Sequence, residues 1–131
     1  MPALVDTVRR FFEADPRTAA AVWVFGSRIQ GTSRPESDVD IGVLFRTSLA
    51  PTLDGQPFDL AADLEGALGH PVDLVVLNTA PADLRIRVLR EGVLAFEGDA
   101  VARVRFEVAT RNEYFDLEPI LTEYRRPRRS A

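Results

Sequence analysis

The stretch that decides the fold is residues 23–45, WVFGSRIQGTSRPESDVDIGVLF. An apolar run at 21–25 stops at Gly26 and Ser27, and a polar segment follows. The segment ends in Asp38, Val39 and Asp40, which lead directly into a second apolar run at 41–45. Short apolar runs bounded by turn residues indicate buried strands, so the stretch predicts two strands joined by a polar connection.

Asp38 and Asp40 are two residues apart at the start of the second predicted strand. Side chains alternate along a strand, so both carboxylates share one face. Two adjacent carboxylates repel each other, and a hard divalent cation such as Mg²⁺ removes that conflict. The pair therefore predicts a metal site.

Gly26 and Ser27 follow a buried strand and precede a helix that we expect to begin at residues 27–30. Glycine lets a phosphate approach the backbone, a serine hydroxyl adds a hydrogen-bond donor, and a helix N-terminus favours anions. The sequence thus predicts a phosphate-binding turn facing the aspartates. The alternative is a plain tight turn.

Asp73 is the one charged residue in the apolar run VDLVVL at 72–77, a third predicted strand that we expect to be buried. A buried carboxylate needs a partner, and a cation shared with Asp38 and Asp40 is one solution. Three carboxylates can hold two magnesium ions about 3.5–4 Å apart. The alternatives are a salt bridge to an arginine or an exposed strand edge.

The other polar residues of the connection either belong to the nucleotide-binding site or are ordinary surface and turn residues. Arg28 is expected to contact the triphosphate of a nucleotide, whereas Arg34 is expected to be a solvated surface residue. Ser37 either orients Asp38 or caps a turn. Trp23 and Phe25 alternate along a strand and are expected to belong to the core.

The remaining pattern predicts one α/β domain over residues 1–131, with about four strands and flanking helices. A C-terminal helical extension, residues 99–131, begins at a capping Asp99 and is kinked or restarted by Pro119. We expect Gly42 to leave open space beneath the carboxylates. The predicted helices before the extension cover 3–14, 58–68 and 81–91, and the strands cover 20–25, 39–45, 72–77 and 93–96.

Composition excludes several classes of chemistry. All 16 basic residues are arginine, there is no cysteine, and His70 is the single histidine. A P-loop needs lysine, disulfides and thiolate nucleophiles need cysteine, and most nucleophilic triads need histidine. The net charge of −4 argues against direct DNA binding. No apolar run approaches the roughly 20 residues of a membrane span and no signal peptide is recognised, so we expect a cytoplasmic protein.

Gly26 and Ser27, followed after ten residues by Asp38-x-Asp40, resemble the GSx10DxD signature of the DNA polymerase β-like nucleotidyltransferase superfamily. Residues 25–45 look especially like the minimal nucleotidyltransferases (MNT). Asp73 stands where that family has its third metal ligand. The tail NEYFDLEPILTEYRR resembles the ends of such proteins, so the resemblance covers nearly the whole chain.

The resemblance implies a mixed β-sheet, two Mg²⁺ ions held by Asp38, Asp40 and Asp73, and ATP or another nucleoside triphosphate as nucleotide donor. Small MNT proteins are often antitoxins that pair with HEPN-domain toxins. By resemblance this chain is expected to transfer AMP to a tyrosine hydroxyl of such a toxin and to form an oligomer with it. The alternatives are a nucleotidyltransferase acting on a small molecule, such as an aminoglycoside, and a non-catalytic antitoxin that blocks its partner sterically.

The C-terminal segment, residues 114–124, mixes aromatic and acidic residues. We expect it to bind the partner protein. The alternative is that this helix simply packs on the sheet.

Overall fold

The computed structural model describes residues 2–26, 29, 31, 38–46 and 58–125. Its four strands form one sheet in the order β3-β2-β1-β4, with β2 and β3 parallel and the other pairs antiparallel. This mixed sheet with flanking helices confirms the predicted fold. The elements in chain order are α1 (Pro2–Ala14), β1 (Ala19–Phe25), β2 (Val39–Phe45), α3 (Phe58–Leu68), β3 (Val72–Val76), α4 (Ala82–Glu91), β4 (Val93–Glu97) and α5 (Ala100–Arg125).

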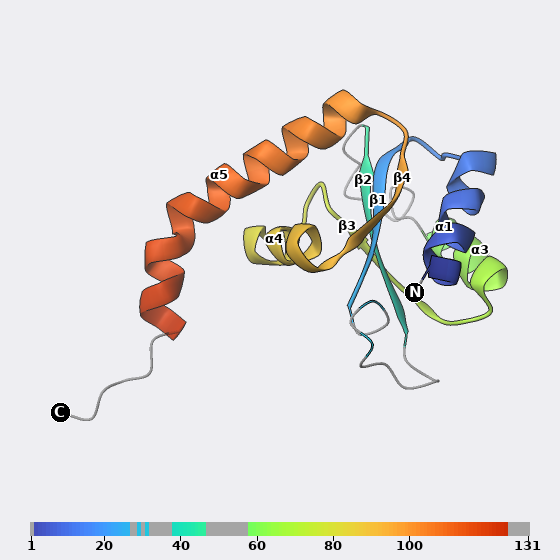
Figure 1. Ribbon diagram of the computed structural model, residues 1–131, viewed down its shortest axis with the longest axis horizontal. Coiled ribbons are helices and arrows are strands. Elements are labelled where there is room, and N and C mark those ends of the chain that lie inside the picture. Colours follow the sequence, from blue (N-terminus) through green and yellow to red (C-terminus); the bar gives the residue numbers. More distant parts are fainter. Residues whose placement is uncertain (1, 27–28, 30, 32–37, 47–57, 126–131) are drawn as a thin grey trace.

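Helices cover both faces of the sheet, with α1 and α3 on one side and α4 and α5 on the other (Figure 1). The odd-numbered residues of β2 meet the first side, where Ile41 packs with Phe12 of α1 and Leu64 of α3 in one apolar cluster. All three side chains are fully buried. This alternation leaves Asp40, Gly42 and Leu44 facing α4 and α5.

A second apolar cluster lies between the sheet and the helices α4 and α5. Trp23 and Phe25 belong to it, together with Leu77 and Val88. Trp23 also contacts Phe106 of α5, with ring centroids 5.8 Å apart. The prediction that Trp23 and Phe25 are core residues is therefore confirmed.

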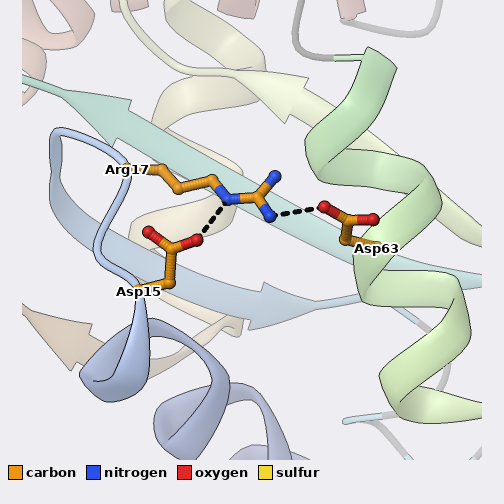
Figure 2. Close-up of polar contacts among 3 residues, drawn as sticks. All are labelled: Asp15, Arg17 and Asp63. Atoms are coloured by element: carbon orange, nitrogen blue, oxygen red, sulfur yellow. Dashed lines mark hydrogen bonds and ion pairs between the residues drawn. The ribbon is translucent and has the colours of Figure 1, made fainter.

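The turn between α1 and β1 is held by an arginine between two aspartates (Figure 2). Arg17 Nε donates to Asp15 at 2.9 Å, and its Nη2 donates to Asp63 of α3. Arg17 and Thr18 both have positive φ, at 49° and 60°. The two hydrogen bonds thus hold a turn that non-glycine residues rarely adopt and tie it to α3.

The last helix, α5, is the longest element at 26 residues. Its start follows the predicted cap, because Asp99 Oδ1 accepts a hydrogen bond from the backbone of Ala102 at 3.1 Å. The helix continues through Pro119 to Arg125, so it does not restart there, and the alternative of a kink at Pro119 stays a prediction. Across the described residues, neither α5 nor any other helix combines the length and apolarity needed to cross a membrane.

We predict that Val8→Ala lowers the free energy of unfolding by about 1.5–3 kcal/mol, because Val8 is fully buried between α1 and the sheet. Val108→Ala is the matched control: the same two methyl groups are removed, but Val108 is 51% exposed on α5. The free energy of unfolding of Val108→Ala should stay within about 0.5 kcal/mol of the wild-type value. Urea denaturation of both variants checks this, and equal losses would contradict the assignment of the core.

Candidate active site

Asp40 and Asp73 lie side by side on the parallel strands β2 and β3, where they are direct register partners. Both ends of this pairing are fixed by further hydrogen bonds. Val39 donates its N–H to the carbonyl of Pro71 at 2.9 Å. At the other end the Asn78 side chain both donates to and accepts from the backbone of Phe45, each at 2.9 Å. The register that brings the two carboxylates together is therefore fixed at both ends.

Gly26 lies against the Asp40 carboxylate. β1 ends at Phe25, which pairs with Asp40 across the antiparallel ladder, and Gly26 then turns with φ of 81°. A Cβ on Gly26 would stand 2.0 Å from Asp40 Oδ2, so only glycine fits. The Gly26 carbonyl accepts a hydrogen bond from the N–H of Ile29 at 3.1 Å, which marks the start of the turn. The predicted glycine turn and aspartates are thus in contact.

The electrostatics of the site centre on Asp40, whose side chain is partly buried. Burial is the main cause that raises the pKa of its carboxyl, followed by the charge of Asp73. The charge of Asp38 and a hydrogen bond between the carboxyl groups of Asp40 and Asp73 raise it further, while the Arg87 guanidinium lowers it. In the part of the chain that the structure describes, two carboxylates thus raise this pKa and only the charge of Arg87 lowers it.

The donor set fits a hard divalent cation. Carboxylate oxygens are the ligands that Mg²⁺ prefers, and a cation between Asp40 and Asp73 would remove the repulsion that now raises the pKa of Asp40. Within the described ranges, no group of three His, Cys, Asp or Glu side chains is already arranged to hold a metal ion. The fit of the site to Mg²⁺ therefore rests on the adjacent carboxylates of Asp40 and Asp73. Asp38 is exposed at the entry to β2.

Two expectations about the surroundings of the carboxylates are wrong. Asp73 is exposed because β3 is an edge strand, so the expected buried carboxylate is wrong and the alternative of an exposed strand edge is confirmed. No arginine among the described side chains forms a salt bridge with it, and its relation to Asp40 comes from strand register. The space beside Gly42 is not open either: Leu77 fills it, with its Cδ1 3.2 Å from where a Cβ would stand.

Several predicted site residues lie outside the described residues. These are Ser27, Arg28 and Ser37, together with Arg34 and most of the helix expected at 27–30. Their roles in binding a nucleotide stay predictions.

Arg87 of α4 is a site residue that the sequence analysis missed. Its charge acts on Asp40, and its Nε forms an ion pair with Glu91 at 3.2 Å. The signal in the sequence that could have identified Arg87 is that Ile86 and Val88 lie on either side of it. These two residues are buried and fix how α4 lies on the sheet. That signal becomes useful only once α4 is known to cover the aspartate face.

Comparison with known proteins agrees with this geometry. A family model described as polymerase beta, nucleotidyltransferase, matches residues 7–100. The protein adenylyltransferase MntA of Shewanella oneidensis strain MR-1 is 42% identical over 72 residues, which are 54% of this chain and 49% of that protein. The matched region thus spans about half the length of this curated relative.

Two solved structures extend the likeness over more of the chain. A toxin–antitoxin crystal structure with AMP-PNP shares 25% identity and a TM-score of 0.69, covering 92% of this chain and 97% of that one. A candidate minimal nucleotidyltransferase shares 37% identity and a TM-score of 0.52, covering 68% of this chain and 93% of that one. With the family model matched across both Gly26 and the three aspartates, the chain belongs to the polymerase β nucleotidyltransferase family.

Proposed function

We propose that this chain is a magnesium-dependent adenylyltransferase that moves AMP from ATP to a hydroxyl group of a protein partner. The observation that carries the proposal is the register pair Asp40 and Asp73 with Gly26 against it. The curated relative is named a protein adenylyltransferase, and one similar toxin–antitoxin structure contains AMP-PNP. By family resemblance the partner is a HEPN-type toxin and the acceptor is a tyrosine.

The proposed roles follow from position in the site. Asp38 and Asp40 would hold both Mg²⁺ ions, and Asp73 the one nearer the acceptor. Bound there, the ions would supply charge neutralisation at the phosphates of ATP. These proposed roles need no lysine, no cysteine and no histidine triad.

The turn after β1 would receive the β- and γ-phosphates. The absence of a side chain on Gly26 leaves backbone accessible there, and Ser27 would add a hydroxyl donor. Arg28 would contact the triphosphate, and Ser37 would orient Asp38. These contacts would align the α-phosphorus with the acceptor oxygen, which is the main requirement of phosphoryl-group transfer.

Asp73 is also the proposed general base. The acceptor oxygen bonds to the α-phosphorus, the bond from that phosphorus to pyrophosphate breaks, and the hydroxyl proton passes to an Asp73 carboxylate oxygen. Its exposed side chain suits this role, because an acceptor from another protein can reach it.

Incubation with labelled ATP, Mg²⁺ and the product of the neighbouring gene tests the proposal. Label on the partner supports it. Label on a small molecule instead favours the aminoglycoside-type alternative, and a stable complex without label favours a steric antitoxin.

We predict that Asp38→Ala combined with Asp40→Ala lowers adenylyl transfer by about 100-fold or more, because charge neutralisation at the transferred phosphoryl group provides several kcal/mol. Removing repelling charges should leave the fold intact, which circular dichroism checks. Transfer at the wild-type rate in a folded double variant would refute the site.

Gly26→Ala should abolish transfer, since the new Cβ overlaps Asp40 Oδ2. Gly69→Ala is the matched control: its φ of 72° resembles the 81° of Gly26, but nothing lies within 4 Å of the added Cβ. Both variants carry the backbone strain of about 1–2 kcal/mol, so they differ in what the new Cβ meets and in whether it lies in the proposed phosphate-binding turn. Similar activity in the two would show that contact with Asp40 is unimportant.

The raised pKa of Asp40 predicts how apo stability depends on pH. Asp40 stays protonated to a higher pH in the folded state than in the unfolded state, where its carboxyl has the ordinary pKa of about 3.8. Stability is therefore lost as pH rises from about 3.8 through the folded-state pKa, and the loss remains at neutral pH. Asp40→Asn, which mimics the protonated form, should melt higher than wild type at pH 7 without Mg²⁺.

The difference between the two proteins should shrink when the pH is lowered through 3.8, because below that value wild-type Asp40 is protonated in both states. Added Mg²⁺ should raise the melting temperature of wild type but not of Asp40→Asn. A variant that melts below wild type in metal-free buffer at pH 7 would contradict the assignment.

A further inference from the structure

Helix α5 presents apolar side chains on two faces, and only one of them is covered. Its inner face packs on the sheet and α4: Phe106 meets Trp23, and Thr110 is fully buried. Tyr114 is also buried, with the Arg90 guanidinium 4.7 Å from its ring centroid. The inner face is thus occupied by contacts within the chain. Tyr114, the first residue of the segment expected to bind the partner, belongs to this inner face.

The outer face carries a stripe of exposed apolar residues, which we call the α5 stripe. It consists of Val101, Val104, Val108 and Phe115, which are 61%, 47%, 51% and 59% exposed. At 100° per residue these four lie within about 60° of one another on the helix, and they extend for about 21 Å along it. α5 is the outermost element on its side of the sheet, and its far end runs out beyond α4 (Figure 1). Exposed apolar side chains gathered on one face of a helix in this way mark an interaction site.

The spacing of the α5 stripe selects a helical partner. Successive members are three, four and seven residues apart. These are the a and d positions of a heptad, the pattern by which one helix packs along another. A sheet edge or an extended peptide has a period of two and does not match it.

The charges on the α5 stripe select an acidic partner. Arg111 occupies the heptad position between Val108 and Phe115, and Arg105 lies beside Val101 and Val108 on the helix surface. Both are exposed, and neither has an ion-pair partner among the described side chains. By contrast, Glu113 pairs with Arg85 at 2.5 Å, and Arg103 pairs with Glu107. The two arginines of the outer face are thus available to carboxylates of another molecule.

The same charges disfavour a second copy of this chain as the occupant. Two α5 stripes packed together would bring arginines toward one another and bury Arg111 without a carboxylate. Burying an unpaired charge is strongly unfavourable. A different protein with acidic residues beside its apolar seam satisfies both the spacing and the charges.

We propose that the α5 stripe docks an amphipathic helix of the acceptor protein, with apolar residues at a and d positions and acidic side chains opposite Arg105 and Arg111. This rests on the proposed function for the identity of the partner as the acceptor. α5 packs on the same sheet face that carries Asp40, through Ala102 and Phe106. A partner docked on α5 is therefore held on the side of the molecule where its hydroxyl is needed.

The test measures binding of the full-length chain to the product of the neighbouring gene by titration calorimetry. Val108→Glu should weaken binding by about 30-fold or more, as for a central apolar contact of an interface. Val93→Glu is the matched control, since Val93 is 41% exposed but lies on β4, away from the stripe. It should bind within about twofold of wild type. Denaturation curves confirm that both variants fold.

A charge variant tests the second half of the proposal. Wild-type affinity should fall as salt rises, and Arg105→Glu combined with Arg111→Glu should bind more weakly and lose that salt dependence. Wild-type affinity in Val108→Glu, or no binding of the wild-type chain to this partner, overturns the proposal. So does sedimentation of the chain alone as a dimer that Val108→Glu dissociates, because the occupant is then a second copy.

Failure of this inference is distinguishable from failure of the proposed function. Val108→Glu should keep the rise in melting temperature on adding Mg²⁺ and ATP, whereas Asp40→Asn should lose it and still bind the partner. Partner binding that depends on the α5 stripe, without transfer of label, leaves the docking surface standing and refutes the enzymatic function.

Discussion

The repulsion between Asp40 and Asp73 is the constraint on which the rest of the site depends. Neighbouring parallel strands hold the two carboxylates in register, and partial burial raises the pKa of Asp40. A fold selected for stability alone gains nothing from such a pair. The arrangement becomes favourable only when a cation shares the two carboxylates, so the resting site is built for a ligand.

The topology explains why the groups meet at one end of the sheet. β1 ends at Phe25 and pairs antiparallel with β2, so Gly26 arrives beside Asp40, the second residue of β2. β2 and β3 are parallel, which places the start of β3 next to the start of β2. The crossover through α3 lies on the opposite face. The carboxylates are therefore left on the face of α4, where Arg87 acts on Asp40.

The proposed catalytic site and the proposed docking surface occupy different parts of the molecule. The carboxylates lie at one end of the central strands, whereas the α5 stripe lies on the outer side of a helix that extends beyond α4. Because Trp23 and Phe106 hold α5 to the sheet, the distance between docking surface and site is set by a rigid contact. The proposed acceptor would thus be oriented by the fold and not by a flexible tether.

Local patterns in the sequence determined the elements and most of their boundaries. Buried runs such as 41–45 have strand periodicity, and Asp99 caps α5 through a contact three residues away. The signature from Gly26 to Asp40 identified the family, because turn chemistry and strand alternation are local properties. These features need no knowledge of how distant segments pack.

Tertiary structure decided everything that depends on neighbours in space. The sequence left open whether Asp73 is buried or lies on an exposed strand edge, and only the strand order, which makes β3 an edge, decides it. Leu77 fills the space beside Gly42 from another strand's end, and the charge of Arg87 acts on Asp40 only because α4 crosses that face. Helical periodicity likewise identifies the apolar residues of α5, but it does not show which face of this helix the sheet covers. Packing buried Tyr114 and left Phe115 exposed.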